Sequence, residues 1–89
     1  MILYYIFNLE NKKMKIVLIE WLDSKEGPSG WEYREEVEPL KPVSCKSVGF
    51  LIGNNKKYKT LVSTISKHQI LSRITIPSCS IINYRVLSQ

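Results

Sequence analysis

Acidic residues are missing from the second half of this 89-residue chain. All eight lie between Glu10 and Glu38, and the 51 residues from Pro39 onward contain six Lys and two Arg but no Asp or Glu. The formal charge is therefore about −3 for residues 1–38, which also hold five cations, and +8 for residues 39–89. A segment of one sign either presents a positive face to an anionic partner or lies against the acidic half of its own chain. The sequence leaves both alternatives open.

Histidine and cysteine are also scarce, which limits the catalytic and metal chemistry of the chain. Cys45 and Cys79 lack the spacing of a metal or redox motif, so we expect two reduced, buried thiols. The alternative is a disulfide between them, which requires that their segments are adjacent strands. The one histidine, His68, lies in a polar loop segment, where we expect a solvated imidazole. The sequence therefore predicts no catalytic residues, no metal site and no cofactor, and favours a nonenzymatic protein.

Long apolar runs and export signals are not found either. The N-terminal apolar stretch, residues 1–9, is too short to cross a bilayer and is not preceded by basic residues. We therefore expect a cytoplasmic protein without a membrane partner. The composition, 44% apolar and 24% charged, is that of an ordinary folded domain, and the length allows one small core.

The strand signals are clear in the middle of the chain. Residues 15–22 are rich in β-branched and aromatic side chains, which predicts a strand. Residues 47–52 and 58–66 flank a Gly- and Asn-containing turn, which predicts a β-hairpin whose turn uses positive φ angles. Gly49 inside the first arm of this hairpin indicates a bulge or a sharp bend.

The remaining segments complete a mainly β protein. Residues 73–76 and 80–87 predict two further strands, giving five, whereas residues 31–40 fit either a short helix or an extended acidic loop. Residues 1–13 are either an N-terminal extension or an extra edge strand. We therefore predict one domain over residues 14–89, with five to six antiparallel strands and room for one short helix.

Several short motifs occur in an order that resembles a known group of proteins. They are Ile-Glu-Trp-Leu-Asp-Ser at 19–24, Gly-Trp at 30–31, Cys-Lys-Ser-Val-Gly-Phe-Leu-Ile at 45–52, and Ile-Pro at 76–77. This order resembles that of short uncharacterised phage and prophage proteins, over residues 16–87. The resemblance implies phage origin and a small antiparallel β-barrel of the SH3-like or Sm-like kind. It carries over no catalytic residue, and the N-terminal helix of Sm-type chains has no counterpart in this sequence.

The basic half of the chain supplies the candidate ligand-binding residues. They are Lys56, Lys57, Tyr58, Lys59, Lys67, Arg73, Tyr84 and Arg85. Cations interleaved with aromatic residues are typical of surfaces that bind single-stranded nucleic acid. Lysines at a hairpin tip also serve solubility and protect strand edges, and this interpretation is favoured. For Trp21 and Trp31 we expect core positions rather than stacking platforms.

The acidic segment offers a third interpretation of the charge pattern. Residues 32–38 contain four Glu and can pair with the basic face of another copy of the chain, in an assembly that high salt would weaken. We therefore expect a binding or interaction module of unknown ligand. A protein partner or self-association ranks first, and a nucleic acid or nucleotide, including a host nucleotide signal, ranks second.

Overall fold

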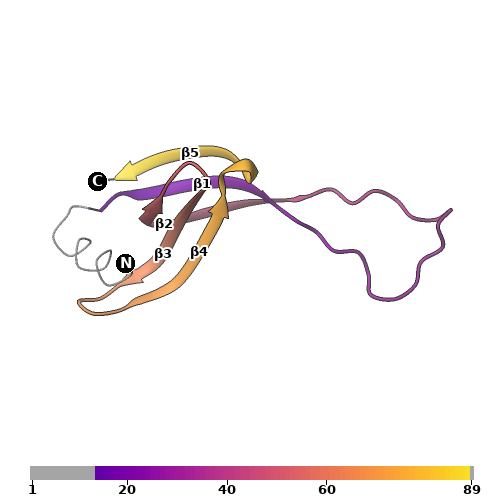
Figure 1. The fold of residues 1–89 in the computed structure, drawn as a ribbon, viewed down its shortest axis with the longest axis horizontal. Helices are drawn as coiled ribbons and strands as arrows, with labels where there is room; N and C mark the ends of the chain where they lie inside the picture. The colour runs from indigo at the N-terminus through magenta and orange to yellow at the C-terminus, as the bar shows by residue number, and fades with distance from the viewer. Residues whose placement is uncertain (1–13, 89) are drawn as a thin grey trace.

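The computed structural model describes residues 14–88, which form one antiparallel sheet of five strands (Figure 1). The elements are β1 (Ile16–Asp23), β2 (Val43–Asn54), β3 (Tyr58–Ile65), β4 (Ile70–Pro77), the 3-10 turn η1 (Ser78–Ser80) and β5 (Ile81–Ser88). Their order in the sheet is β4-β3-β2-β1-β5. The predicted mainly β, five-stranded antiparallel fold is confirmed. The predicted extension or edge strand in residues 1–13 lies outside the described residues.

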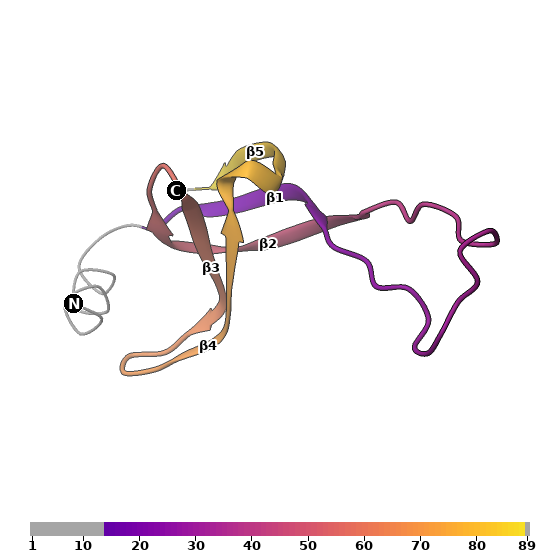
Figure 2. The same ribbon diagram turned by 45° about the vertical axis from the view of Figure 1, so that its right-hand side comes forward.

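Strand β2 connects the two halves of the sheet. Its first part pairs with β1, from Asp23↔Val43 to Ile16↔Phe50, and its last part pairs with β3, beginning at Phe50↔Val62. The register of β2 and β3 shifts between Leu51 and Gly53, which is a β-bulge that increases the local twist. As a result β3 and β4 run across the direction of β1 and β2 (Figure 2).

Gly49 lies close to this bend but is not itself the bulged residue. A Cβ atom built at Gly49 would lie 2.8 Å from the carbonyl oxygen of Val62 and 3.3 Å from Leu61 Cβ. The glycine therefore allows β3 to approach β2 more closely than any side chain would permit. The sequence predicted a bulge or a sharp bend at Gly49. In the structure the bulge follows Leu51, and Gly49 is instead the point at which β3 approaches β2 closely.

The core lies on the concave face of the curled sheet. Val17 and Ile19 of β1, Leu61 of β3 and Ile76 of β4 are fully buried. Four partly buried side chains pack against them, from β1 (Trp21), β2 (Leu51) and β5 (Ile81 and Tyr84). The cluster contains side chains from all five strands and therefore holds them together. Burying one such aliphatic side chain contributes about 1.5–3 kcal/mol to the stability of the fold.

The sheet is open, in contrast to the closed barrel that we expected. Strands β4 and β5 are its two edges, and residues 14–88 contain no strand pairing between them. They are joined through η1, which turns the chain so that β5 returns along β1. The physical reason is the β3–β4 hairpin, which bends away from the other strands toward its turn (Figure 2). Side chains, rather than a hydrogen-bonded ladder, connect the two edges.

The turn between β2 and β3 forms the predicted hairpin by an unexpected means. The side-chain oxygen of Asn55 accepts hydrogen bonds from the backbone N–H groups of Lys57 (2.8 Å) and Tyr58 (2.9 Å). Asn side chains commonly stabilise turns in this way. The positive φ angles that we expected at this turn are not used, because within residues 14–88 only Gly30 and Ser72 have positive φ.

Residues 24–42, which we call the arm, connect β1 to β2 and project from the sheet (Figures 1 and 2). The arm contains one backbone turn, in which Glu36 N donates to Tyr33 O at 3.0 Å, and no helix. Of the two alternatives for residues 31–40, the loop is therefore correct. Every residue of the arm is exposed, and the molecule measures 58 × 24 × 20 Å along its principal axes.

Replacing Gly49 with Ala should destabilise the sheet, because the new methyl group would meet backbone atoms of β3 that cannot move independently of the strand. Overpacking of this kind typically costs about 1–3 kcal/mol in the free energy of unfolding. Urea denaturation measures it. Gly27→Ala is the matched control, since its Cβ would meet only ordinary contacts of 3.5 Å or more. Equal stability of the two variants would contradict the close approach at Gly49.

Candidate functional site

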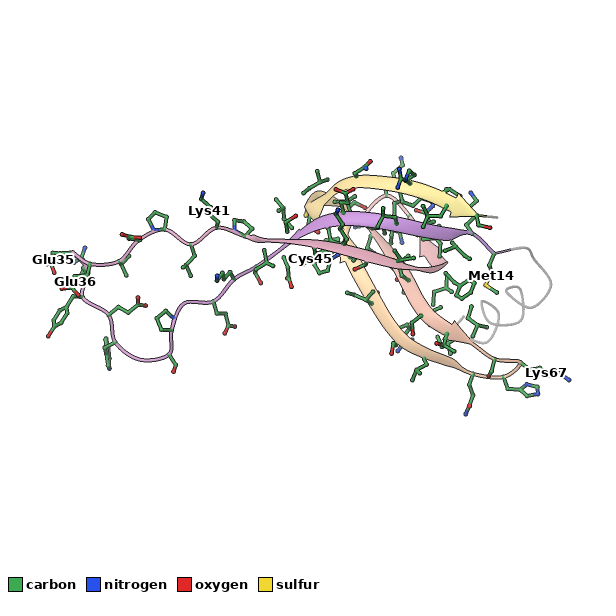
Figure 3. All side chains as sticks on the ribbon, turned by 180° about the vertical axis from the view of Figure 1, so that it is seen from behind. Met14, Glu35, Glu36, Lys41, Cys45 and Lys67 are labelled. Carbon is green, nitrogen blue, oxygen red and sulfur yellow. The ribbon has the colours of Figure 1, made fainter. Side chains whose placement is uncertain are left out.

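The eight predicted binding residues do not form one surface in the structure. Lys56, Lys57 and Tyr58 lie at the turn between β2 and β3 and are exposed, and Lys59 follows them on the concave side of β3. Lys67 lies in the turn between β3 and β4, at the far end of that hairpin (Figure 3). The other members of the set belong to β4 and β5. The set therefore divides into a turn cluster, a pair on the concave side and separate cations.

Lys59 and Tyr84 form the pair on the concave side. The Lys59 ammonium lies 4.7 Å from the centroid of the Tyr84 ring, and it donates a hydrogen bond to the side-chain oxygen of Asn54. Tyr84 is half-buried and packs against the core. This cation–π contact links β3 to β5 across the open side of the sheet. It also occupies a ring face that base stacking would require, which gives both residues a structural role.

Arg73 and Arg85 lie on the opposite, outer face of the sheet. Arg73 pairs with Val62 and Arg85 pairs with Leu18. Adjacent residues of a strand point to opposite faces, so these positions face away from the concave side that holds Val17 and Ile19. Of the eight predicted residues, only the three at the β2–β3 turn are adjacent, exposed and without an assigned structural role.

The arm contains exposed apolar side chains that the sequence interpretation missed. Trp31 is fully exposed, at 104% of its reference area, and Tyr33, Val37 and Leu40 are each at least half exposed. The core position expected for Trp31 is therefore wrong. The position expected for Trp21 is confirmed in outline, since it is half-buried against the core and its indole N–H donates to Ser47 Oγ at 3.0 Å.

A signal for the exposure of Trp31 is present in the sequence. Two glycines and a proline precede it within five residues, and four Glu follow within the next seven. A segment of this composition cannot bury enough apolar surface to fold onto a core, so a single tryptophan within it remains exposed.

The arm carries a negative charge that is held away from the basic sheet. It contains five Glu against Lys25, Arg34 and Lys41, whereas residues 43–88 contain seven cations and no acid. Glu35 and Glu36 lie at the tip of the arm, and Lys67 lies at the opposite end of the molecule (Figure 3). The acidic segment therefore does not lie against the basic half of its own chain, which was one of the two alternatives posed by the charge pattern.

The thiols and the histidine are placed at or near the surface. Cys45 is half-buried, Cys79 in η1 is exposed, and both are free. The expected burial is therefore wrong for Cys79, because η1 lies at the edge of the sheet. His68 is exposed in a turn where Ser66 and Gln69 hydrogen-bond to each other, in agreement with the predicted polar loop. Residues 14–88 contain no group of three or more His, Cys, Asp or Glu side chains placed to hold a metal ion.

No protein-family model, no curated protein and no solved structure matches this chain. Over the described range, none of the elements is a helix with the length and apolar character needed to cross a membrane. The surfaces that remain for a functional argument are the arm, the outer face of the sheet and the β2–β3 turn.

Replacing Lys59 with Met keeps the length of the side chain but removes the cation above Tyr84. We expect a loss of about 0.5–1 kcal/mol in the free energy of unfolding, the contribution of a partly exposed cation–π contact. Urea denaturation followed by Trp21 fluorescence measures it. Lys57→Met, at the exposed turn, is the control and should leave stability unchanged. A Lys59→Met variant as stable as this control would show that the contact adds nothing to the link between β3 and β5.

Proposed function

We propose that this chain is a nonenzymatic interaction module that self-associates, with the acidic arm of one copy bound to the basic sheet of another. The observation that carries the proposal is the complete exposure of Trp31 on an arm that points away from its own sheet. A tryptophan left in water forgoes a large favourable burial, and aromatic side chains of this kind contribute most strongly to interfaces. The arm thus has the composition of a binding segment.

The charges support a partner that is a second copy. The arm is acidic and the sheet is basic, so copies approach in an orientation that brings unlike charges together. The apolar side chains of the arm then supply affinity, while the Glu residues supply orientation and salt dependence. Because the acidic arm and the basic sheet of one molecule do not contact each other, they can pair only with the opposite surface of another copy.

The support for a link to the small-barrel group that the motifs resemble is limited to the five-stranded antiparallel sheet. This sheet has the strand order β4-β3-β2-β1-β5, a 3-10 turn before the last strand and open edges. We therefore propose an open relative of the SH3-like and Sm-like folds, of the phage type, acting in the cytoplasm. Because such folds serve many functions, the interaction role is argued from the arm and the charges and not from the fold.

A second candidate function is binding of a nucleic acid or nucleotide, including capture of a host nucleotide signal. It is favoured by the β2–β3 turn, where Lys56 and Lys57 directly precede Tyr58, a residue that is 43% exposed. Ammonium groups contact phosphates and an exposed ring stacks on a base. The cluster is small, since Lys59 and Tyr84 are occupied with each other. We therefore rank this function below self-association.

Self-association is tested by light scattering coupled to size exclusion over a range of protein concentrations. At low salt we expect a mass above the 10.4 kDa of one chain, rising with concentration, and at 1 M salt we expect dissociation toward the monomer. A single 10.4 kDa species at all concentrations in low salt would refute the proposed function.

Binding of a random single-stranded oligonucleotide at low salt, followed by fluorescence anisotropy, tests the second function. If the turn cluster binds nucleic acid, Tyr58→Ala should weaken binding by about 1–3 kcal/mol, the usual contribution of one stacked base. Lys67→Ala, a cation at the distant hairpin turn, is the control and should have a smaller effect. Absence of binding to the unmodified protein at low salt, where lysine contacts are strongest, would exclude this function.

A further inference from the structure

The outer face of β1, β2 and β5 carries an apolar strip bordered by cations. The pairings place Val48 of β2, Leu18 of β1 and Arg85 of β5 side by side in one row across the three strands. In the next row Lys46 of β2 lies beside Glu20 of β1. Residues in such a row have Cβ atoms about 4.5–5.5 Å apart, so these side chains form one continuous surface.

We call Leu18, Lys46, Val48 and Arg85 the outer patch. Val48 is 59% exposed, Leu18 is half-buried, and both cations are exposed. Glu20 is the acidic residue that faces the patch, and its row partner is Lys46. Arg85 has Leu18 as its partner and is therefore available to a carboxylate from outside. An aliphatic floor with a guanidinium beside it is suited to a segment that combines an aromatic ring with carboxylates.

We propose that the outer patch of one copy is the docking surface for the arm of a second copy, with Trp31 on Val48 and Leu18 and the neighbouring Glu residues on Arg85 and Lys46. This rests on the proposed self-association and names the surface that it uses. The Arg85 guanidinium also has the planar shape to stack on the indole of Trp31, a contact that strengthens as water is excluded.

The other exposed surfaces fit the arm less well. The β2–β3 turn offers Lys56 and Lys57 without an exposed aliphatic floor. The outer face of β4 offers Leu71, which is 63% exposed, but with Arg73 as its one nearby cation on the same face. The copy's own arm leaves the sheet after Asp23 and returns at Val43, extending away from the patch (Figure 1). A second copy is therefore the source of the arm.

The experiment compares variants of the full chain by light scattering at low salt. Val48→Glu removes the apolar floor and repels the acidic arm, and Arg85→Glu reverses the charge beside it. Each should weaken self-association by at least about tenfold, as expected for a residue at the centre of an interface. Lys67→Glu is the matched control for Arg85→Glu, because both replace a cation with an acid and Lys67 lies outside the patch, in the turn between β3 and β4. It should weaken association by less than about twofold. Thermal unfolding verifies that each variant is folded.

Mixing two variants tests the pairing directly. The Trp31→Ala variant has an impaired arm and an intact patch. The double variant with Val48→Glu and Arg85→Glu has an intact arm and an impaired patch. We expect each to be monomeric alone, and an equimolar mixture to contain a species of twice the monomer mass. Association of the patch variant by itself would indicate contacts between arms and overturn the proposal, as would association of Trp31→Ala by itself or a mixture that stays monomeric.

The outcomes also separate this proposal from the broader one. If the unmodified protein is monomeric at every concentration, self-association itself fails. If the unmodified protein associates but Val48→Glu and Arg85→Glu behave like Lys67→Glu, self-association stands and the outer patch is not its docking surface.

Discussion

The close contact of β2 with β3 is the constraint on which the remaining structure depends. The core needs Leu61 of β3 and Ile76 of β4 to reach Val17 and Ile19 of β1, although β2 separates these strands in the sheet. Only a sharp bend of β2 brings them together, and this bend is provided by the bulge after Leu51 and by the missing side chain at Gly49. Without the bend the sheet would be flat, and one small face could not exclude water from its aliphatic side chains.

The curled sheet also separates the two kinds of charge. Its concave face is filled mainly by apolar side chains, so the cations of residues 43–88 other than Lys59 are left on the outer face and at the turns. The acidic residues are concentrated in the arm, which contributes no buried side chain. The buried core and most of the acidic side chains therefore belong to different parts of the chain. This division explains how a domain of this size can leave a tryptophan in water, since the core does not require it.

The sequence predicted the elements whose signals are local. The β-branched run of β1, the turn between β2 and β3 and the alternating residues before Pro77 each specify a strand or a turn within a few residues, and the five strands follow from them. The exposure of Trp31 and of Cys79 was not predicted, because burial depends on which segments pack together. Apolar character indicates that a residue can be buried, while the path of the arm and of η1 decides that it is not.

Local sequence signals also could not predict which basic residues lie together on the surface. Their positions depend on the alternation of faces and on register, which place Arg85 beside Leu18 on the outer side and Lys59 over Tyr84 on the inner side. The closed barrel was implied by the resemblance of the motifs and had no local signal of its own. Closure depends on the direction in which the β3–β4 hairpin leaves the sheet, and that direction is set by the bend in β2.

The arm begins and ends at one pair of neighbours, Asp23 on β1 and Val43 on β2. Both strands are anchored on either side of that point, so the sheet keeps its register whatever length of chain connects the two residues. Lengthening such a connection has a conformational entropy cost that grows only with the logarithm of its length, about 0.6 kcal/mol per doubling. The segment between β1 and β2 can therefore change in length and sequence with little effect on the stability of the sheet.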